Sequence, residues 1–438
     1  MPSSSKSLIC FFSLINNVLE RIDKTKPGLI KFLSDSNKFK SINPEMIDEN
    51  VSELKEYQEW TQKELLSWKI FDDVSLKSSD YNQPNIIAAI NKDVEGTLIF
   101  NGHSDVVPVT KEQENVWDLG TPWGGEIIDN KICGRGASDM KGGSVAFLWA
   151  IKSIVESNVD LKRSIIATLV SGEETGNHKV GIDNIPNLDV KKSYIISAEP
   201  TGMKVCSSSV GEFYFLIKID GRSTSLSNRH LSIYPNKINS PIPGVNAIDK
   251  MWKIQRALYD LERDWGIWEK HDLMEAGNMN INISIIKGGE TYSALADSCE
   301  IVGSVLFKPD LNLADVVNQF KETIESVSIS DRWLKNNPPK VQIPYVLDAK
   351  PPINISPKSK FCADFSKAFE KIKKEKPQFN CSTTTSDANY LHQYGHDIIT
   401  FGPGEIEAGV HGPNEYVNID NLVESTKIYA LSAINWCT

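Results

Sequence analysis

The stretch LIFNGHSDVVP, residues 98–108, decides the fold class. It begins as an unbroken apolar run, as buried strands do, and its turn at Gly102 is followed at once by a histidine. Further short apolar runs, at residues 85–90, 164–170 and 194–197, are bounded by turn residues and separated by helical stretches. This alternation predicts parallel strands in an α/β protein whose main domain has three layers, α/β/α.

A histidine and two acids follow the ends of these runs. His103 and Asp105 lie on the same side of an extended chain, and Glu199 follows the run at 194–197. A neutral imidazole and carboxylates are common zinc ligands, and a carboxylate two residues on can hold the second N–H of the ring. Taken alone, His103 and Asp105 also fit a strand-end histidine paired with a local acid.

Two adjacent acids, Glu173 and Glu174, follow the strand predicted at 164–170, in the sequence LVSGEETG. Neighbouring like charges repel each other, and burial raises that cost, so a cation is expected beside them. One carboxylate can bind metal while its neighbour takes a proton from a bound water. For this pair alone, an exposed acidic turn is the alternative.

Two glycine-containing loops supply further candidate ligands. Asp139 lies in GRGASDMKGG, residues 134–143, which matches neither glycine pattern of phosphate-binding loops, and His411 lies in VHGPNE, residues 410–415. Together the five clusters predict a centre for two divalent cations, because His, Asp, Glu-Glu, Glu and His recur beside apolar runs. Oxygen and nitrogen donors without thiolates favour zinc, with cobalt or manganese as alternatives.

The order of the predicted helices and strands changes in the middle of the chain. A strand-like alternation at 211–219 is followed by a polar loop and then by helix, strand, strand and helix. This order predicts a smaller α+β domain, residues 208–328, inserted between catalytic segments 1–207 and 329–438. A length of 438 residues also favours two domains. The prolines of residues 336–357 predict the return connection.

Composition narrows the classes of function. A net charge of −10 argues against a nucleic-acid partner, and no apolar run reaches the length of a membrane span. Seven scattered cysteines without a C-x-x-C pair predict reduced thiols and a cytoplasmic location. Apolar residues 8–15 faintly resemble a secretory signal, but no small-residue cleavage site follows, so an amphipathic first helix is predicted.

With these five motifs in this order, the sequence resembles the dinuclear zinc deacylases and exopeptidases that include acetylornithine deacetylase, succinyl-diaminopimelate desuccinylase and aminoacylase. The resemblance covers most of the chain. It implies that His103 and Glu199 bind one metal ion and that Glu174 and His411 bind the other. It also implies that Asp139 bridges the two ions.

The same resemblance implies a reaction. Glu173 would be the general base that takes a proton from the metal-activated water and passes it to the leaving amine, and Asp105 would orient His103. The inserted domain resembles the lid of the family, through which members commonly dimerise, so a homodimer is expected. The implied activity is hydrolysis of an amide bond in a small N-acylated amino acid or related amine, as in acetylornithine deacetylase.

The predicted lid departs from the family pattern at two places. Members carry a histidine four residues after a glycine, whereas here Gly221 is followed by Ser225, and His230 comes five residues later. Members also carry Asn-x-x-Pro and then an arginine that grip the substrate carboxylate, at positions matched here by residues 293–296 and by Leu306.

These departures leave the substrate-binding residues open. His230, Arg222 and Arg229 are the candidates, because they bring polar or positive groups to this loop. Two other functions stay open as well. One is a dipeptidase with the same metal site, and the other is a metal-binding homologue with weak or lost catalysis, since losing one oxyanion donor typically lowers the rate by about 10²–10³.

Overall fold

The structure, a computed structural model, describes residues 3–78, 82–91, 96–185, 193–234 and 241–438. It divides into two compact units. Unit 1 consists of Met1–Ser208, Ile355–Ser382 and Ser386–Thr438, and unit 2 consists of Ser209–Asn354 and Thr383–Thr385. The inserted unit therefore ends at Asn354 and not at residue 328 as the sequence suggested.

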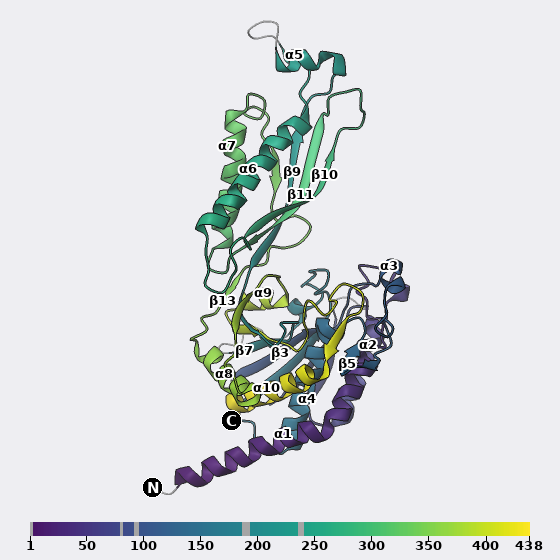
Figure 1. Ribbon diagram of the computed structural model, residues 1–438, viewed down its shortest axis with the longest axis vertical. Coiled ribbons are helices and arrows are strands. Elements are labelled where there is room, and N and C mark those ends of the chain that lie inside the picture. Colours follow the sequence, from purple (N-terminus) through teal and green to yellow (C-terminus); the bar gives the residue numbers. More distant parts are fainter. Residues whose placement is uncertain (1–2, 79–81, 92–95, 186–192, 235–240) are drawn as a thin grey trace. The chain divides into compact units, whose positions relative to one another are not determined.

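Unit 1 is built on a mixed β-sheet (Figure 1). Its strands run in the order β1-β2-β6-β3-β7-β15-β8, with β14 on β8. The four central strands are parallel, and β1, β2 and β8 are antiparallel to their neighbours. The strands are β1 (Asp73–Lys77), β2 (Asn85–Ile90), β3 (Thr97–His103), β6 (Ser164–Val170), β7 (Tyr194–Ser197), β8 (Val205–Ser209), β14 (Phe379–Ser382) and β15 (Asp397–Thr400). The α/β class predicted from the sequence is confirmed.

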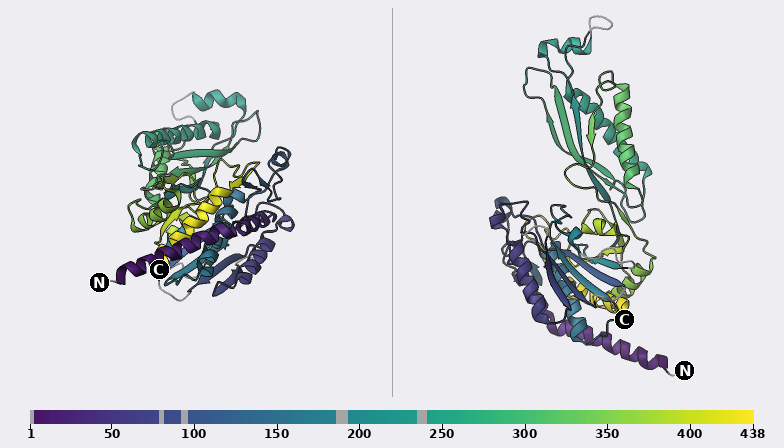
Figure 2. Two further views of the ribbon diagram at one scale, coloured as in Figure 1. Left: turned by 60° about the horizontal axis from the view of Figure 1, so that its bottom comes forward. Right: turned by 180° about the vertical axis from the view of Figure 1, so that it is seen from behind.

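Helices α4 and α10 cover one face of this sheet, and α1 packs on both of them (Figures 1 and 2). Phe100 of β3 faces these helices, because its ring lies 5.5 Å from those of Phe147 in α4 and Tyr429 in α10. The helical segments are α1 (Ser3–Ser36), η1 (Glu49–Val51), α2 (Leu54–Trp68), α3 (Lys111–Asn115), η2 (Ala137–Lys141), α4 (Gly142–Glu156), η3 (Ile182–Asn184), α8 (Lys360–Lys373), α9 (Asp387–His392) and α10 (Ile419–Cys437). Among the described residues, no helix is both long and apolar enough to span a bilayer.

A small antiparallel sheet joins two distant parts of unit 1. It contains β4 (Ile127–Ile128), β5 (Lys131–Cys133) and β16 (Tyr416–Asn418), in the order β16-β5-β4. Tyr416 pairs with Cys133, so the loop that follows β5 and the loop that precedes β16 begin side by side. These are the loops that carry Asp139 and His411.

Unit 2 is an antiparallel sheet with two helices on one face. The strand order is β10-β11-β9-β12, and alternate residues of β9 and β11 are buried against the helices. Its elements are β9 (Gly211–Asp220), η4 (Leu226–Asn228), α5 (Arg229–Ile233), α6 (Ala247–Trp268), β10 (Asn280–Gly288), β11 (Ser298–Phe307), α7 (Leu313–Ser330), β12 (Lys340–Gln342) and β13 (Ile353–Asn354). The side chains of Asn246 and Asn312 accept hydrogen bonds from the first turns of α6 and α7, as good N-caps do.

Strand β12 explains the shifted boundary. Residues 340–342 pair with β9 and so extend the sheet of unit 2, whereas the sequence predicted only a return connection there. The strand is three residues long and has one half-buried side chain between two exposed ones, which gives almost no apolar signal. The loop predicted at residues 221–243 likewise contains the short helices η4 and α5.

Candidate metal centre

Three parallel strands bring their carboxyl ends to one edge of the unit 1 sheet. In the register of the strands, His103 at the end of β3 lies opposite Val170 of β6, and Asn101 lies opposite Ser197 of β7. Glu173 and Glu199 follow those two strand ends within a few residues. The sheet therefore collects the predicted ligands in the place where α/β proteins bind ligands.

The small sheet delivers the other two predicted ligands. Asp139 follows β5, and His411 precedes β16 in a left-handed backbone conformation, with φ of 58°. Close packing also needs Gly143 at the start of α4. A side chain there would meet the carbonyl oxygen of Ala198 at 2.1 Å, so only glycine lets the helix approach the segment that carries Glu199.

The side chains form two groups that share Asp139. The Nε2 atom of His103 lies 3.0 Å from Oδ1 of Asp139 and 3.8 Å from the carboxylate of Glu199. The Nε2 atom of His411 lies 3.4 Å from Oδ2 of Asp139 and 3.0 Å from the carboxylate of Glu174. The two oxygens of Asp139 thus face different histidines, which is the arrangement of a bridging carboxylate.

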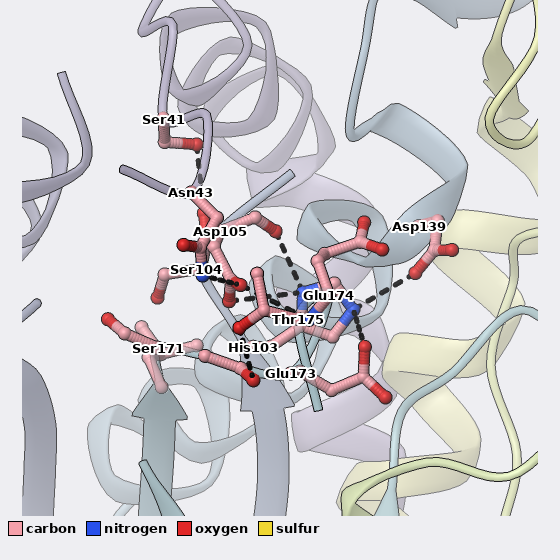
Figure 3. Close-up of polar contacts among 12 residues, drawn as sticks. Ser41, Asn43, His103, Ser104, Asp105, Asp139, Ser171, Glu173, Glu174 and Thr175 are labelled. Carbon is pink, nitrogen blue, oxygen red and sulfur yellow. Dashed lines mark hydrogen bonds and ion pairs between the residues drawn. The ribbon is translucent and has the colours of Figure 1, made fainter. Parts of the chain in front are cut away.

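Glu173 lies at the edge of this cluster. Its carboxylate is 3.9 Å from Nε2 of His103, and its side chain is only partly exposed. Figure 3 shows the carboxylates of Asp139, Glu173 and Glu174 gathered around the His103 imidazole. The structure therefore brings together all of the acids and histidines that the sequence selected for the metal centre.

The orientation of His103 differs in one detail from the prediction. Its Nδ1 lies 2.8 Å from the main-chain carbonyl of Asp105, which can only accept, so this nitrogen carries the proton. The Asp105 carboxylate is 3.8 Å away and instead accepts from the Asn43 amide at 2.8 Å and from the backbone N–H of Glu174 at 3.2 Å. The main-chain carbonyl of Asp105 thus orients the His103 ring, and the carboxylate of Asp105 connects this segment to the backbone of Glu174.

Burial and neighbouring charges shift the pKa values of the acids and histidines in this cluster. Burial raises the pKa of Glu174 to about 8, and burial also raises the pKa of Glu199 well above its ordinary value. Hydrogen bonds to Asp139 and Glu174 raise the pKa of His411 to about 10. Burial lowers the pKa of His103, but the hydrogen bond to Asp139 and the negative charges of Glu199, Glu173 and Asp139 together outweigh burial and leave the pKa well above its usual range.

These features fit a metal ion. Because Nδ1 of His103 carries a proton, its Nε2 atom needs either a second proton or a bound cation to face the Asp139 carboxylate favourably. One carboxylate oxygen each of Glu174 and Glu199 is buried without a hydrogen-bond partner among the described residues. His103, Asp139 and Glu174 each offer a ligand atom, all within 4.8 Å of one another.

A buried ion pair, which the sequence analysis did not select, adjoins this cluster. Arg135 donates to the carboxylate of Glu415, whose other oxygen accepts from backbone N–H groups of the Asp139 loop. Both residues lie inside the motifs quoted above. The sequence features that could have identified them are the position of Arg135 between two glycines and the position of Glu415 four residues after His411.

The three candidate substrate-binding residues all lie in unit 2. Arg229 pairs with Asp249 at 3.0 Å, and Arg222 donates to the carbonyl of Ile242 at 3.1 Å. His230 is exposed, and its Nδ1 lies 3.0 Å from the carbonyl of Ser227. Both arginines thus already have partners within unit 2.

Two of the three positions where the chain departs from the expected lid pattern, Ser225 and residues 293–296, are neighbours in unit 2. Ser225 pairs with Ala294 across an antiparallel bridge, the backbone N–H of Leu226 donates to Ser293, and that of Leu295 donates to Thr224. Leu306 lies apart from them, near the other end of β11, where it pairs with Glu212 of β9.

The comparisons with known proteins agree with this architecture. The family model described as Peptidase family M20/M25/M40 matches residues 99–435. The N-formyl-4-amino-5-aminomethyl-2-methylpyrimidine deformylase of Bacillus subtilis is 30% identical over 350 residues, which are 78% of this chain and 80% of that protein. The succinyl-diaminopimelate desuccinylase of Rickettsia felis is 28% identical over 425 residues, 91% of this chain and 97% of that one.

The fold has a match among solved structures. An M20 family metallo-carboxypeptidase from Sulfolobus solfataricus superimposes with a TM-score of 0.68 and 19% identity, over 93% of this chain and 98% of that one. Family model, relatives and fold agree over most of the sequence. The chain therefore belongs to peptidase family M20/M25/M40 and is a hydrolase of that family.

Proposed function

We propose that this chain hydrolyses the amide bond of a small N-acylated amine with the help of two divalent cations. The observation that carries the proposal is the Asp139 carboxylate, whose two oxygens face two different histidines beside the acid pair of Glu173 and Glu174. Metal binding alone has no use for a second acid next to a ligand, whereas hydrolysis needs a base there.

In this proposal His103 and Glu199 would hold one cation, Glu174 and His411 would hold the other, and Asp139 would contribute to both. Three carboxylates against two divalent cations leave one positive charge, which a hydroxide would neutralise. Imidazole and carboxylate ligands favour zinc, with cobalt or manganese as alternatives.

When bound, the cations supply Lewis acidity, which lowers the pKa of a water toward neutrality and polarises the acyl carbonyl. Glu173 takes the proton of that water and delivers it to the nitrogen of the leaving amine. Asp105 keeps the Nδ1 proton of His103 in place, so that Nε2 is the nitrogen left to bind a cation.

The amine product is proposed to lack a carboxylate. The deformylase relative is named for an aminopyrimidine substrate without a carboxylate, and Leu306 stands where the family resemblance expects a carboxylate-gripping arginine. Arg229 is already neutralised by Asp249. Among the three candidate substrate-binding residues, His230 is therefore preferred over Arg222 and Arg229, which favours N-formyl amines over N-acyl amino acids.

A homodimer through unit 2 and a cytoplasmic location complete the proposal. Helix α6 exposes Ile248, Trp252 and Tyr259 at helical spacing, and the edge strand β10 exposes Ile285 and Ile286. Exposed apolar side chains beside an unpaired strand edge are typical of an interface.

The six cysteines whose side chains the structure describes are free thiols, as expected in a reducing compartment.

The test is a panel of N-formyl, N-succinyl and N-acetyl amines, with and without a carboxylate, assayed by release of the amine from zinc-loaded protein. Glu173→Gln is expected to lower kcat by about 10²–10⁴ while two zinc ions stay bound. The matched control is Glu20→Gln on the exposed face of α1. Cleavage of free-amine dipeptides alone would favour the dipeptidase, and zinc binding without any cleavage would favour the non-catalytic homologue.

A further inference from the structure

The Arg135–Glu415 ion pair is buried beside the candidate metal centre. The Arg135 side chain is 1% exposed and that of Glu415 is 0% exposed. Burial of two charges is unfavourable unless good geometry and further hydrogen bonds compensate it. Both residues make further hydrogen bonds to the loops that carry Asp139 and His411.

Glu415 holds the backbone of the residue placed between the two histidines. One of its carboxylate oxygens accepts from the N–H of Ser138 at 3.0 Å and from that of Asp139 at 3.1 Å. The backbone leaves helical geometry at Asp139, with φ −120° and ψ 100°. The loop therefore depends on a side chain to fix this residue, and Glu415 supplies it.

Arg135 connects the same loop to the one that carries His411. It donates to Glu415 through Nη1 and to the carbonyl of Gly412 through Nη2, the latter at 3.0 Å. The backbone N–H of Gly134 also donates to the carbonyl of Glu415 at 2.8 Å. The pair thus clamps the two loops at the point where Asp139 and His411 must face each other.

We propose that Glu415, held by Arg135, is a positioning residue for the dinuclear centre. It touches neither cation nor substrate, and it sets the distances of Asp139 from His103 and His411 through the main chain. This inference rests on the proposed metal centre. Loss of such a partner typically weakens metal binding by about 10–100-fold.

Unit 2 offers a matched control of the same chemistry. Asp331 is buried, accepts from the backbone N–H groups of Trp333 at 2.9 Å and Leu334 at 3.0 Å, and pairs with Lys250 and Lys253. It belongs to unit 2, whereas the candidate ligands all belong to unit 1. Asp331→Asn should therefore destabilise the protein without changing metal binding.

The experiment titrates zinc into metal-free Glu415→Gln, Asp331→Asn and the unmodified protein against a competing chelator. It also records cobalt(II) absorption and magnetic coupling between two bound cobalt ions. Glu415→Gln is expected to bind zinc 10–100-fold more weakly and to lose or alter the cobalt coupling, whereas Asp331→Asn keeps both. Unchanged affinity and an unchanged cobalt spectrum in Glu415→Gln would overturn the inference.

A second variant covers failure of Glu415→Gln to fold. Arg135→Lys keeps the charge but cannot donate to Glu415 and Gly412 together in the planar guanidinium geometry. It should weaken zinc binding and alter the cobalt spectrum, and wild-type values in this variant would equally overturn the inference. If the unmodified protein itself bound no pair of metal ions, the proposed function would fail first, so the two failures are distinguishable.

Discussion

Replacing Glu174 should remove the loss of stability with rising pH that the burial of this carboxyl causes in the metal-free protein. Burial raises the pKa of this carboxyl from 4.5 to about 8, so the folded chain binds the proton more tightly than the unfolded chain does. The stabilisation is therefore complete below pH 4.5 and is lost as the pH rises through about 8. Glu174→Gln removes this loss, because an amide does not ionise.

The size of the effect follows from the same pKa. Each pH unit between the unfolded and folded pKa values removes about 1.4 kcal/mol, so between pH 6 and pH 9 Glu174 costs about 2–3 kcal/mol. Unit 1 has about 290 residues and an unfolding entropy of roughly 2.1 cal/mol/K per residue, so this corresponds to about 3–5 °C in Tm. As the pH rises from 6 to 9, metal-free Glu174→Gln should gain this amount in Tm relative to the unmodified protein, in addition to the difference already present at pH 6.

Differential scanning calorimetry of chelator-treated protein at pH 6, 7.5 and 9 measures the effect. Glu20→Gln on α1, an exposed carboxyl of the same type, should follow the unmodified protein at every pH. Zinc should then reverse the ranking at pH 9, since it stabilises the protein that keeps all of the ligands more than the variant that has lost one. A Tm difference that is the same at pH 6 and pH 9 would refute the argument from the buried carboxylate.

Three further predictions concern other parts of the molecule. Phe320→Ala removes a buried ring whose centroid lies 4.8 Å from that of Phe215 and 5.8 Å from that of Phe213. In denaturant titrations this variant should lower the free energy of unfolding of unit 2 by about 3–5 kcal/mol, and the number of zinc ions bound should not change. Trp252→Glu, in a side chain that is 58% exposed on α6, should convert a dimer to monomers in analytical ultracentrifugation, whereas Leu66→Glu on α2 should not. Chelation should abolish amide hydrolysis, and zinc or cobalt should restore it, whereas calcium should not.

The sequence predicted best the strands that are buried on both sides. The bounds of β2, β6 and β7 agree with the apolar runs at 85–90, 164–170 and 194–197, because nearly every residue of these strands is buried. Strand β12 escaped prediction, since its place in the sheet of unit 2 is fixed by pairing with a strand more than a hundred residues earlier. Short edge strands of this kind carry little local signal.

The candidate site was predictable as a set of residue types and not as a set of contacts. The sequence placed His103 and Asp105 two residues apart, but only the backbone geometry decides that the carbonyl of Asp105, and not its carboxylate, contacts the ring. Arg135 and Glu415 are 280 residues apart, and nothing local shows that they meet. Their pairing emerges only when β5 and β16 are placed side by side.

The two histidines of the centre differ in their access to water. The His103 side chain is 1% exposed, whereas that of His411 is 52% exposed. A cation held by His411 and Glu174 would thus exchange with the medium far faster than one held in the interior by His103 and Glu199. Preparations washed with a mild chelator should pass through a half-loaded form that retains the inner ion, and the amount of metal recovered from the protein will depend on how it was purified.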